Sequence, residues 1–217
     1  MTRAVPDTPA RVLLLTGPSG AGKSRLAHRL RARHGWPVVP LDDFYRERGD
    51  PVLPMSPLGL PDWDDPRSWH ADAAVRVLAD LCRTGRTRLP RYDIAASAVV
   101  GRHDIELSGS PVVVAEGIFA AEIVAELRSL GLLAGAWCIR NHPWLTFGRR
   151  LLRDLAERRK PPVTLWRRGH LLRRAEPGMV RAAEALGAVA MTAREAEARI
   201  EGLLAAHAPA PGEDQPA

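Results

Sequence analysis

The chain has 217 residues, of which 46% are hydrophobic and 26% are charged, and its formal net charge is +6. This length accommodates one α/β domain with a buried core but is short for two full domains, and the composition excludes the disordered and membrane-embedded classes. The N-terminal apolar run is far shorter than the roughly 20 residues that span a bilayer, and neither cysteine, Cys82 or Cys138, belongs to a CxxC pair. We therefore expect a cytoplasmic protein with no membrane partner, no disulfide framework and no zinc site.

The charges are segregated along the chain. Residues 140–176 carry eleven Lys or Arg against three Asp or Glu, an excess larger than that of the whole protein, whereas residues 42–72 carry eight acids against three bases. This pattern is consistent with a polyphosphate site in one region and a metal or proton acceptor in another. Solvated surface in an Arg-rich protein would also explain it.

The first half of the chain alternates between strand and helix patterns. Residues 1–10 contain prolines and are expected to form a flexible leader. A buried strand is predicted at 11–16, a helix from Lys23 to about His34, and a second strand at 38–41, directly followed by DDFY. A long, proline-rich acidic loop follows, and helical spacing returns from His70 to about Thr84.

The second half continues this alternation. Strands are predicted at 111–117 and 135–140 with a helix between them, a basic helix from Trp144 to Arg159, two short helices, and a last helix from Ala193 to about Leu204. We expect a single domain over residues 11–206 and a flexible tail at 207–217. The alternation predicts an α/β fold with a parallel sheet flanked by helices, in which ligands bind at the carboxyl ends of the strands.

The segment GPSGAGKS matches the phosphate-loop pattern GxxxxGK[ST] between a predicted strand and a predicted helix. Its glycines allow successive backbone N–H groups to point at phosphate oxygens, Lys23 would reach the β and γ phosphates, and Ser24 would bind Mg²⁺. The fold is therefore predicted to be of the P-loop NTPase type. The positions expected to bind the nucleotide are Gly17, Ser19, Gly20, Ala21, Gly22, Lys23 and Ser24.

Three acidic residues follow predicted strands. Asp42 and Asp43 end the second strand, where a carboxylate can accept a proton from an attacking hydroxyl or hold a water of the Mg²⁺ shell. Glu116 ends a buried strand, where it needs a metal or a base as partner. The alternative for the aspartates is that they cap a strand-to-loop turn.

The basic helix presents several guanidinium groups on one side, from Arg149, Arg150, Arg153 and Arg158. Phosphoryl transfer needs cations over the migrating group, so we predict an Arg-rich helical lid over about residues 144–175. A solvated basic face is the alternative.

Taken together, the motifs GPSGAGKS, DDFY, DWDDPRSW, LPRYD, VVVAEGIF and RRLLRDLAERRK occur in the order and approximate spacing of the uridine/cytidine kinase family. The chain thus resembles this family, within the larger group of P-loop kinases that includes phosphoribulokinase and pantothenate kinase. The resemblance covers roughly residues 12–160.

The resemblance implies an ATP- and Mg²⁺-dependent kinase acting on the 5′-hydroxyl of a nucleoside. It implies that Asp42 is the base, acting with Lys23 and the lid residues Arg150 and Arg153, and that Arg158 binds the nucleotide. Mg²⁺ would be held by Ser24, Glu116 and Asp42. The residues implied to contact the nucleoside are Tyr45, Trp63, Asp64 and Tyr92.

The chain departs from the family at two places. Ser97 stands where the family has a histidine that contacts the pyrimidine, so the resemblance says less about base selectivity. The lid reads ERRK in place of ERGR. Without the family, Trp63 and Trp69 could simply attach the proline-rich loop to the core.

Three other functions remain open from the residues. The chain could be a kinase of another hydroxylated metabolite, which Ser97 favours, a nucleotide-binding regulator, or a basic protein that grips nucleic acid. Asp42 and Glu116 argue against the two pure binders, since binding alone needs no proton acceptor. We therefore expect a small-molecule substrate and no nucleic-acid partner, and leave a homo-oligomer open.

Overall fold

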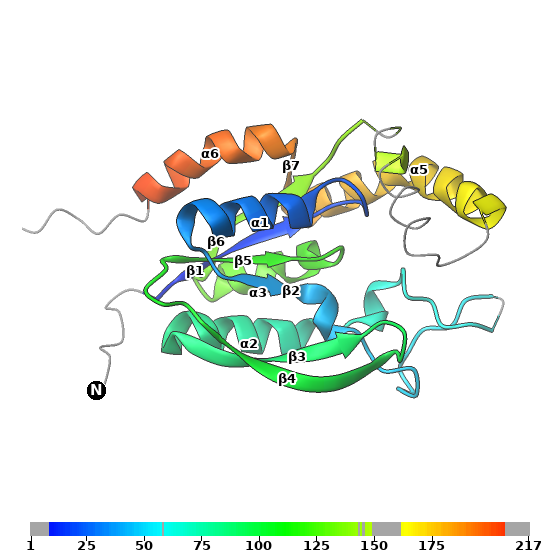
Figure 1. The fold of residues 1–217 in the computed structure, drawn as a ribbon, viewed down its shortest axis with the longest axis horizontal. Coiled ribbons are helices and arrows are strands. Elements are labelled where there is room, and N and C mark those ends of the chain that lie inside the picture. Colours follow the sequence, from blue (N-terminus) through cyan, green and yellow to red (C-terminus); the bar gives the residue numbers. More distant parts are fainter. Residues whose placement is uncertain (1–8, 58, 143, 145, 149–161, 207–217) are drawn as a thin grey trace, which may run out of the picture.

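The fold is built on a five-stranded sheet with helices on both faces (Figure 1), as a computed structural model shows. The structure describes residues 9–57, 59–142, 144, 146–148 and 162–206. The strand order is β2-β5-β1-β6-β7 and every pairing is parallel. The strands are β1 (Arg11–Thr16), β2 (Val38–Pro40), β5 (Val112–Glu116), β6 (Leu133–Ile139) and β7 (Val189–Met191).

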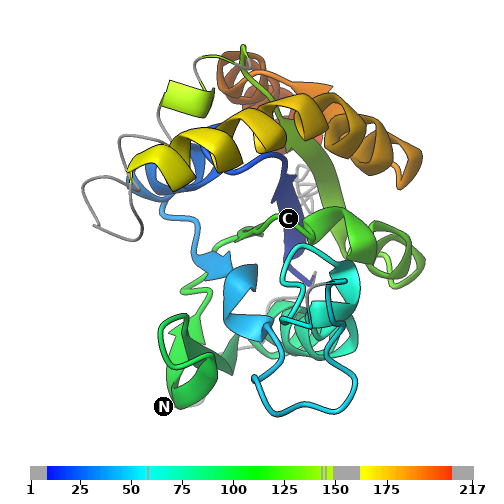
Figure 2. The same ribbon diagram turned by 90° about the vertical axis from the view of Figure 1, so that its right-hand side faces the viewer.

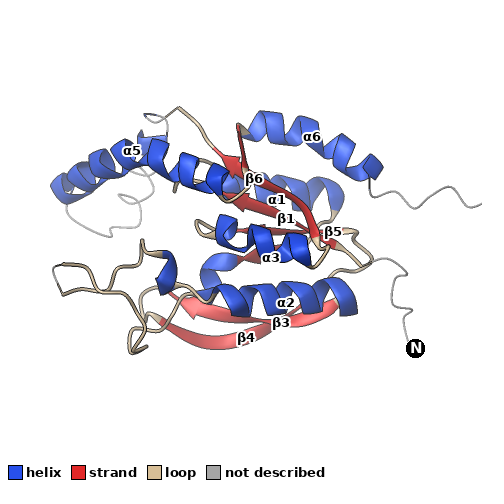
Figure 3. Ribbon diagram, turned by 180° about the vertical axis from the view of Figure 1, so that it is seen from behind, coloured by secondary structure: helices blue, strands red, loops and turns tan. Residues whose placement is uncertain are grey.

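Helices bury both faces of this sheet. On one face, Leu13 and Leu15 of β1 pack in a core with residues of α1 (Lys23–His34) and α6 (Ala193–Ala206). On the other face, Val12 and Leu14 pack in a second core with residues of α2 (Ala71–Thr84), α3 (Val124–Ser129) and α5 (Pro162–Ala185). Figure 3 shows the molecule from behind, with α2 and α3 lying over this second face. Two-sided burial explains why the central strands are continuous apolar runs, as the sequence predicts for a parallel sheet.

A two-stranded antiparallel hairpin, β3 (Arg86–Asp93) and β4 (Ala98–Glu106), lies beside α2 and outside the main sheet. The sequence did not predict it, because its strands lack alternating apolar residues and β3 contains Pro90. A proline is tolerated here since β3 has an unpaired edge. Leu89 alone in β3 is fully buried, and it attaches the hairpin to the core.

The C-terminal half differs from the prediction in two elements. The expected pair of short helices is wrong: α5 is one helix of 24 residues that continues through Pro177. Its last turns pack on the core through Ala183, and this tertiary contact outweighs the helix-breaking tendency of proline. The three-residue strand β7 was not predicted, because it is too short to show a periodic pattern.

The ends of the chain and the predicted lid are partly outside the described residues. Residues 1–8 and 207–217 are outside, whereas Ala10, placed in the leader by the sequence, is buried and donates its N–H to the carbonyl of Cys82. Residues 149–161 are also outside. The lid predicted over about residues 144–175 therefore stays a prediction, of which the structure describes residues 144 and 146–148 and the N-terminal part of α5.

The segment between β2 and α2 begins with a 3-10 helix, η1 (Leu41–Phe44), and passes over the carboxyl ends of the strands. Figure 2 looks onto this end, with the loop on one side of the sheet and α5 on the other. Trp69 is 3% exposed, and its Nε1 donates to the carbonyl of Leu41 at 2.7 Å. Trp69 therefore attaches the proline-rich loop to the core, the role that the residues alone suggest for it.

Candidate active site

The phosphate loop connects β1 to α1 and has the backbone conformation that its glycines allow. Gly17, Gly20 and Gly22 have φ angles of 128°, 87° and 103°. A Cβ atom on Gly17 would collide with the carbonyl oxygen of Ile139 on the neighbouring strand β6. Glycine is thus required at position 17 by both conformation and space.

Lys23 and Asn141 stabilise this loop from two sides. The Nζ of Lys23, whose side chain is buried, donates to the carbonyls of Gly17 at 2.7 Å and Pro18 at 3.2 Å. From just beyond β6, Nδ2 of Asn141 donates to the carbonyl of Ala21 at 3.0 Å. The sequence did not identify Asn141, whose role depends on the neighbouring strand rather than on a local motif.

Ser24, in the first turn of α1, meets Glu116 at the end of β5. The Oγ of Ser24 donates to Oε1 of Glu116 at 2.9 Å. The register explains the contact, because Leu15 at the end of β1 pairs with Glu116 at the end of β5. The hydroxyl and the carboxylate predicted to share a metal ion therefore lie within hydrogen-bond distance.

Asp42 lies in η1, close to Glu116. Burial raises the pKa of its carboxyl to about 6, with a further contribution from the negative charge of Glu116, while Lys23 and the N–H of Ile118 oppose the rise. By its surface area Asp42 is nevertheless an exposed residue, so neighbouring atoms crowd the carboxyl and raise its pKa without enclosing it. This carboxyl remains ionised at pH 7 and is a stronger base than an ordinary aspartate.

Gly117 makes this close arrangement possible. A Cβ at this position would lie 2.8 Å from the Cβ of Leu41 and 3.3 Å from Oδ1 of Asp42. The glycine lets the end of β5 and the start of η1 approach each other, which brings Glu116 and Asp42 to one place.

These residues suit an ATP–Mg²⁺ complex in their chemistry. Backbone N–H groups of a glycine-rich loop and the N-terminus of α1 suit phosphate, and in the described residues no side chain caps that terminus. Oxygen donors from Ser24, Glu116 and Asp42 suit Mg²⁺, which needs few protein ligands when phosphates supply others. In the described part of the chain, no group of three or more His, Cys, Asp or Glu side chains could hold a metal by itself.

An aromatic cluster lies near Asp42, whose charge acts on the ring hydroxyl of Tyr45. The ring of Tyr45 has centroid distances of 5.9 Å to Trp63, 6.0 Å to Tyr92 and 6.0 Å to Phe119. Burial raises the pKa of the Tyr45 phenol, and the charges of Asp42 and Asp64 add to the rise. Predicted substrate residues from three separate segments are therefore brought together.

Phe119 and Asp64 are two further residues near Tyr45. The sequence did not assign Phe119, although its position three residues after Glu116 could have identified it. Asp64 is exposed at the edge of the cluster, and its N–H donates to Oδ1 of Asp62 at 3.1 Å. An acidic group at the rim beside aromatic faces suits a polyhydroxylated ligand.

Ser97 occupies the turn of the β3–β4 hairpin. It is 6% exposed, has a φ of 50°, and its hydroxyl donates to the carbonyl of Ile94 at 3.4 Å. Burial raises the pKa of the nearby Tyr92 hydroxyl, and the Ser97 side chain acts in the opposite direction. Ser97 is thus engaged with its own hairpin.

The predicted lid arginines, Arg150, Arg153 and Arg158, lie outside the described residues, together with Arg149. Their roles remain predictions.

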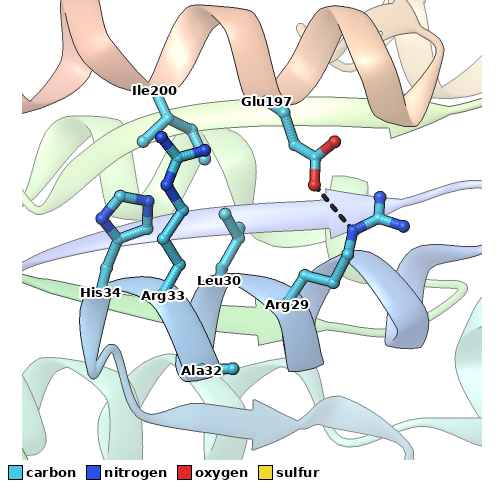
Figure 4. Close-up of a pocket in the computed structure, with 7 residues that line it drawn as sticks. All are labelled: Arg29, Leu30, Ala32, Arg33, His34, Glu197 and Ile200. Atoms are coloured by element: carbon cyan, nitrogen blue, oxygen red, sulfur yellow. Dashed lines mark hydrogen bonds and ion pairs between the residues drawn. The ribbon is translucent and has the colours of Figure 1, made fainter.

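A hollow of about 350 Å³ lies between α1 and α6, at a distance from the phosphate loop along α1 (Figure 4). Its rim includes an ion pair from Nε of Arg29 to Oε1 of Glu197 at 2.7 Å. The lining residues come from the C-terminal half of α1 and from α6, whereas the loop precedes the N-terminus of α1. None of the predicted site residues lines the hollow.

The chain is similar to known proteins in sequence and in fold. No protein-family model matches the chain. Uridine kinase from Saccharomyces cerevisiae is 28% identical over 156 residues, which cover 70% of this chain and 30% of the yeast protein. Inorganic pyrophosphatase TTM2 from Arabidopsis thaliana is 29% identical over 107 residues, which cover 49% of this chain and 15% of that protein. The chain thus spans less than a third of either relative.

Two solved structures have a similar fold. A candidate fructose transport system kinase from Silicibacter sp. TM1040 has a TM-score of 0.57 at 20% identity, over 87% of this chain and 91% of the other. D-glycerate 3-kinase from Cryptococcus neoformans var. grubii has a TM-score of 0.52 at 18% identity, over 78% and 77%. Both support the parallel sheet flanked by helices.

Among the described residues, no helix is both long and apolar enough to cross a bilayer. The predicted α/β fold is confirmed by the sheet and by these structural neighbours, and the predicted resemblance is confirmed by the yeast relative. The chain therefore has the fold of the P-loop kinases and is related in sequence to a uridine kinase.

Proposed function

We propose that the chain transfers the γ-phosphate of ATP to a hydroxyl of a small metabolite, with the 5′-hydroxyl of uridine or cytidine as the first acceptor to test. The observation that carries the proposal is the position of Asp42. The charge of Lys23 in the phosphate loop acts on this carboxylate, and this carboxylate acts on the phenol of Tyr45 in the aromatic cluster. The proposed base is therefore close both to Lys23 of the phosphate-loop motif and to Tyr45 of the aromatic cluster.

The proposed reaction uses these residues in distinct roles. The acceptor oxygen bonds to the γ-phosphorus, the bond to the β–γ bridging oxygen breaks, and ADP leaves. The hydroxyl proton passes to the carboxylate of Asp42, whose raised pKa suits it to receive that proton. Lys23 supplies positive charge to the β and γ phosphates, and the acceptor lies against Tyr45 and Tyr92.

Mg²⁺ would neutralise charge on the phosphates, and Ser24, Glu116 and Asp42 are the residues proposed to hold it. The lid arginines Arg150 and Arg153 are proposed to stabilise the transferring group, and Arg158 to contact the nucleotide. A homo-oligomer and a cytoplasmic location remain predictions from the sequence.

A second candidate is a kinase of a different hydroxylated metabolite. Ser97 favours it for two reasons. A serine has no ring nitrogen with which to contact a base, and this serine is buried and hydrogen-bonded within its own hairpin. The structural neighbours named as fructose transport system kinase and D-glycerate 3-kinase make sugars and sugar acids reasonable members of the test panel.

The experiment is ATP consumption with Mg²⁺ against uridine, cytidine, purine nucleosides, sugars and glycerate, with the product identified by mass. A uridine or cytidine monophosphate would support the first proposal. Turnover of a non-nucleoside alone would replace it with the second. Absence of turnover with every acceptor, alongside measurable ATP binding, would favour a nucleotide-binding regulator.

The role of Asp42 is tested by Asp42→Asn. We expect ATP binding to be retained and turnover to fall by on the order of 10²-fold or more, because the amide cannot accept the proton. Asp80→Asn, the same change on the exposed side of α2, is the matched control. Retained activity in Asp42→Asn would remove Asp42 from the role of base.

A further inference from the structure

Asp42 and Asp43 are neighbours in sequence but face different parts of the molecule. Asp42 is beside Glu116 and Lys23. Asp43 instead accepts, through Oδ1, a hydrogen bond of 3.1 Å from the backbone N–H of Tyr92 in β3, 49 residues away. The two carboxylates therefore have different roles, although the sequence presents them as a pair.

The Asp43 contact is one of several bonds that join the segment after Asp42 to the β3–β4 hairpin. We call this set the hairpin seam. The hydroxyl of Tyr92 donates to the carbonyl of Arg46 at 3.0 Å, the N–H of Arg48 donates to the carbonyl of Ser97 at 3.0 Å, and the N–H of Val99 donates to Oε1 of Glu47 at 3.0 Å. The seam runs from Asp43 to Arg48 on one side and from Tyr92 to Val99 on the other.

The bond accepted by Asp43 is the one bond of the seam whose acceptor is charged, half-buried and next to the proposed base. Its carboxylate is close to the side chains of Arg91 and His103. Hydrogen bonds from a backbone N–H to an ionised carboxylate are stronger than those between neutral groups. The strand β3 supplies this N–H from its unpaired edge, so the donor is not taken from the hairpin ladder.

The seam matters for the site because Tyr92 belongs to both structures. Its ring lies 6.0 Å from that of Tyr45, in the aromatic cluster, while its backbone is held by Asp43 and its hydroxyl by the Arg46 carbonyl. A shift of the hairpin would move this ring relative to the base at Asp42.

We propose that Asp43 is a positioning residue: by holding the Tyr92 backbone, it keeps the hairpin wall of the acceptor site in register with Asp42. This inference rests on the proposed kinase function for its kinetic consequence. Asp43 touches no reacting atom, and its effect acts through Tyr92.

The test compares two variants. Asp43→Ala removes the hydrogen-bond acceptor, whereas Asp43→Asn keeps an oxygen that can accept from the Tyr92 N–H. For Asp43→Ala we expect kcat/KM for the acceptor to fall about tenfold, the typical effect of losing such a bond, with the KM for ATP unchanged. Asp43→Asn should restore most of the loss. Asp104→Ala is the control, since it removes an exposed carboxylate from β4 of the same hairpin.

A second measurement is independent of activity. Amide hydrogen exchange of residues 90–99 should accelerate in Asp43→Ala but not in Asp43→Asn or Asp104→Ala, while exchange in β1 stays the same. Unchanged exchange at 90–99, or an equal loss in both Asp43 variants, would overturn the proposal. If the wild-type protein phosphorylates no acceptor, the kinase proposal fails on that result, and the seam is judged by exchange alone.

Discussion

At the scale of single residues, the site depends on groups whose partners lie far away in the chain. Ser24 meets Glu116, and Asn141 holds the carbonyl of Ala21. The sequence identified Ser24 because it belongs to the phosphate-loop motif, and Glu116 and Asp42 because each lies at the end of a predicted strand. It missed Asn141 because a lone polar residue after a strand carries no local signal, and only the β1–β6 pairing brings it to the loop.

Asp42 also makes a prediction for stability. The pKa of its carboxyl in the folded protein is about 6, against an ordinary value of 3.8, so the folded state binds this proton more tightly than the unfolded state. The ionised carboxylate therefore lowers the free energy of unfolding, progressively as the pH rises from the lower to the higher value and fully above it. In the absence of ATP and Mg²⁺, Asp42→Asn should melt at a higher temperature than the wild type at pH 7.5.

This difference in melting temperature should shrink as the pH is lowered to 4.5. Melting curves in EDTA at several pH values provide the measurement, with Asp80→Asn as the control. A difference that is independent of pH would show that the carboxylate charge is not the cause.

At the scale of elements, the site is made where strand ends and short helices approach closely. The end of β5 and the start of η1 must approach closely for Glu116 and Asp42 to lie side by side, and the missing side chain of Gly117 permits this. The hairpin β3–β4 then supplies Tyr92. Its absence from the sequence prediction has a physical cause: nearly all of β4 is exposed, so no periodic apolar pattern marks it.

Gly117→Ala tests the close approach of β5 and η1. The added Cβ would lie 2.8 Å from the Cβ of Leu41, closer than side-chain carbons pack. We expect a loss of about 1–3 kcal/mol in the free energy of unfolding, as for other overpacked sites, together with reduced turnover. Urea unfolding measures the first quantity. Gly101→Ala, in β4 with open space around the added Cβ, should change neither, and equal effects of both substitutions would contradict the explanation.

At the scale of the whole molecule, the parallel sheet was largely predictable and its surroundings were not. Four of the strands were predicted within a few residues because burial on both faces makes them continuous apolar runs. The fifth strand, the single long helix α5 and the hairpin depend on packing against neighbours. The proposed acceptor site was hard to predict for the same reason, since its aromatic rings come from the loop, from the hairpin and from the segment after β5.

The ion pair between Arg29 and Glu197 links α1 to α6 across one face of the molecule. Both side chains are more than a third exposed, so solvent screens their attraction. Glu197→Gln should therefore reduce the free energy of unfolding by less than about 1 kcal/mol, with the reduction vanishing in about 1 M NaCl. Urea unfolding at two salt concentrations decides the matter, and a larger loss that persists in high salt would mean that Glu197 has a role in packing.

The strand order has a consequence for how such a protein could change its substrate. The strand β5 separates β1, which leads into the phosphate loop, from β2, which leads into η1. Between β2 and β5 the chain runs through η1, the acidic loop, α2 and the hairpin. One contiguous stretch, residues 41–111, therefore encodes nearly the whole of the proposed acceptor side. Recombination or insertion within that stretch could exchange the acceptor side as a module while β1, the phosphate loop and α1 keep their sequence.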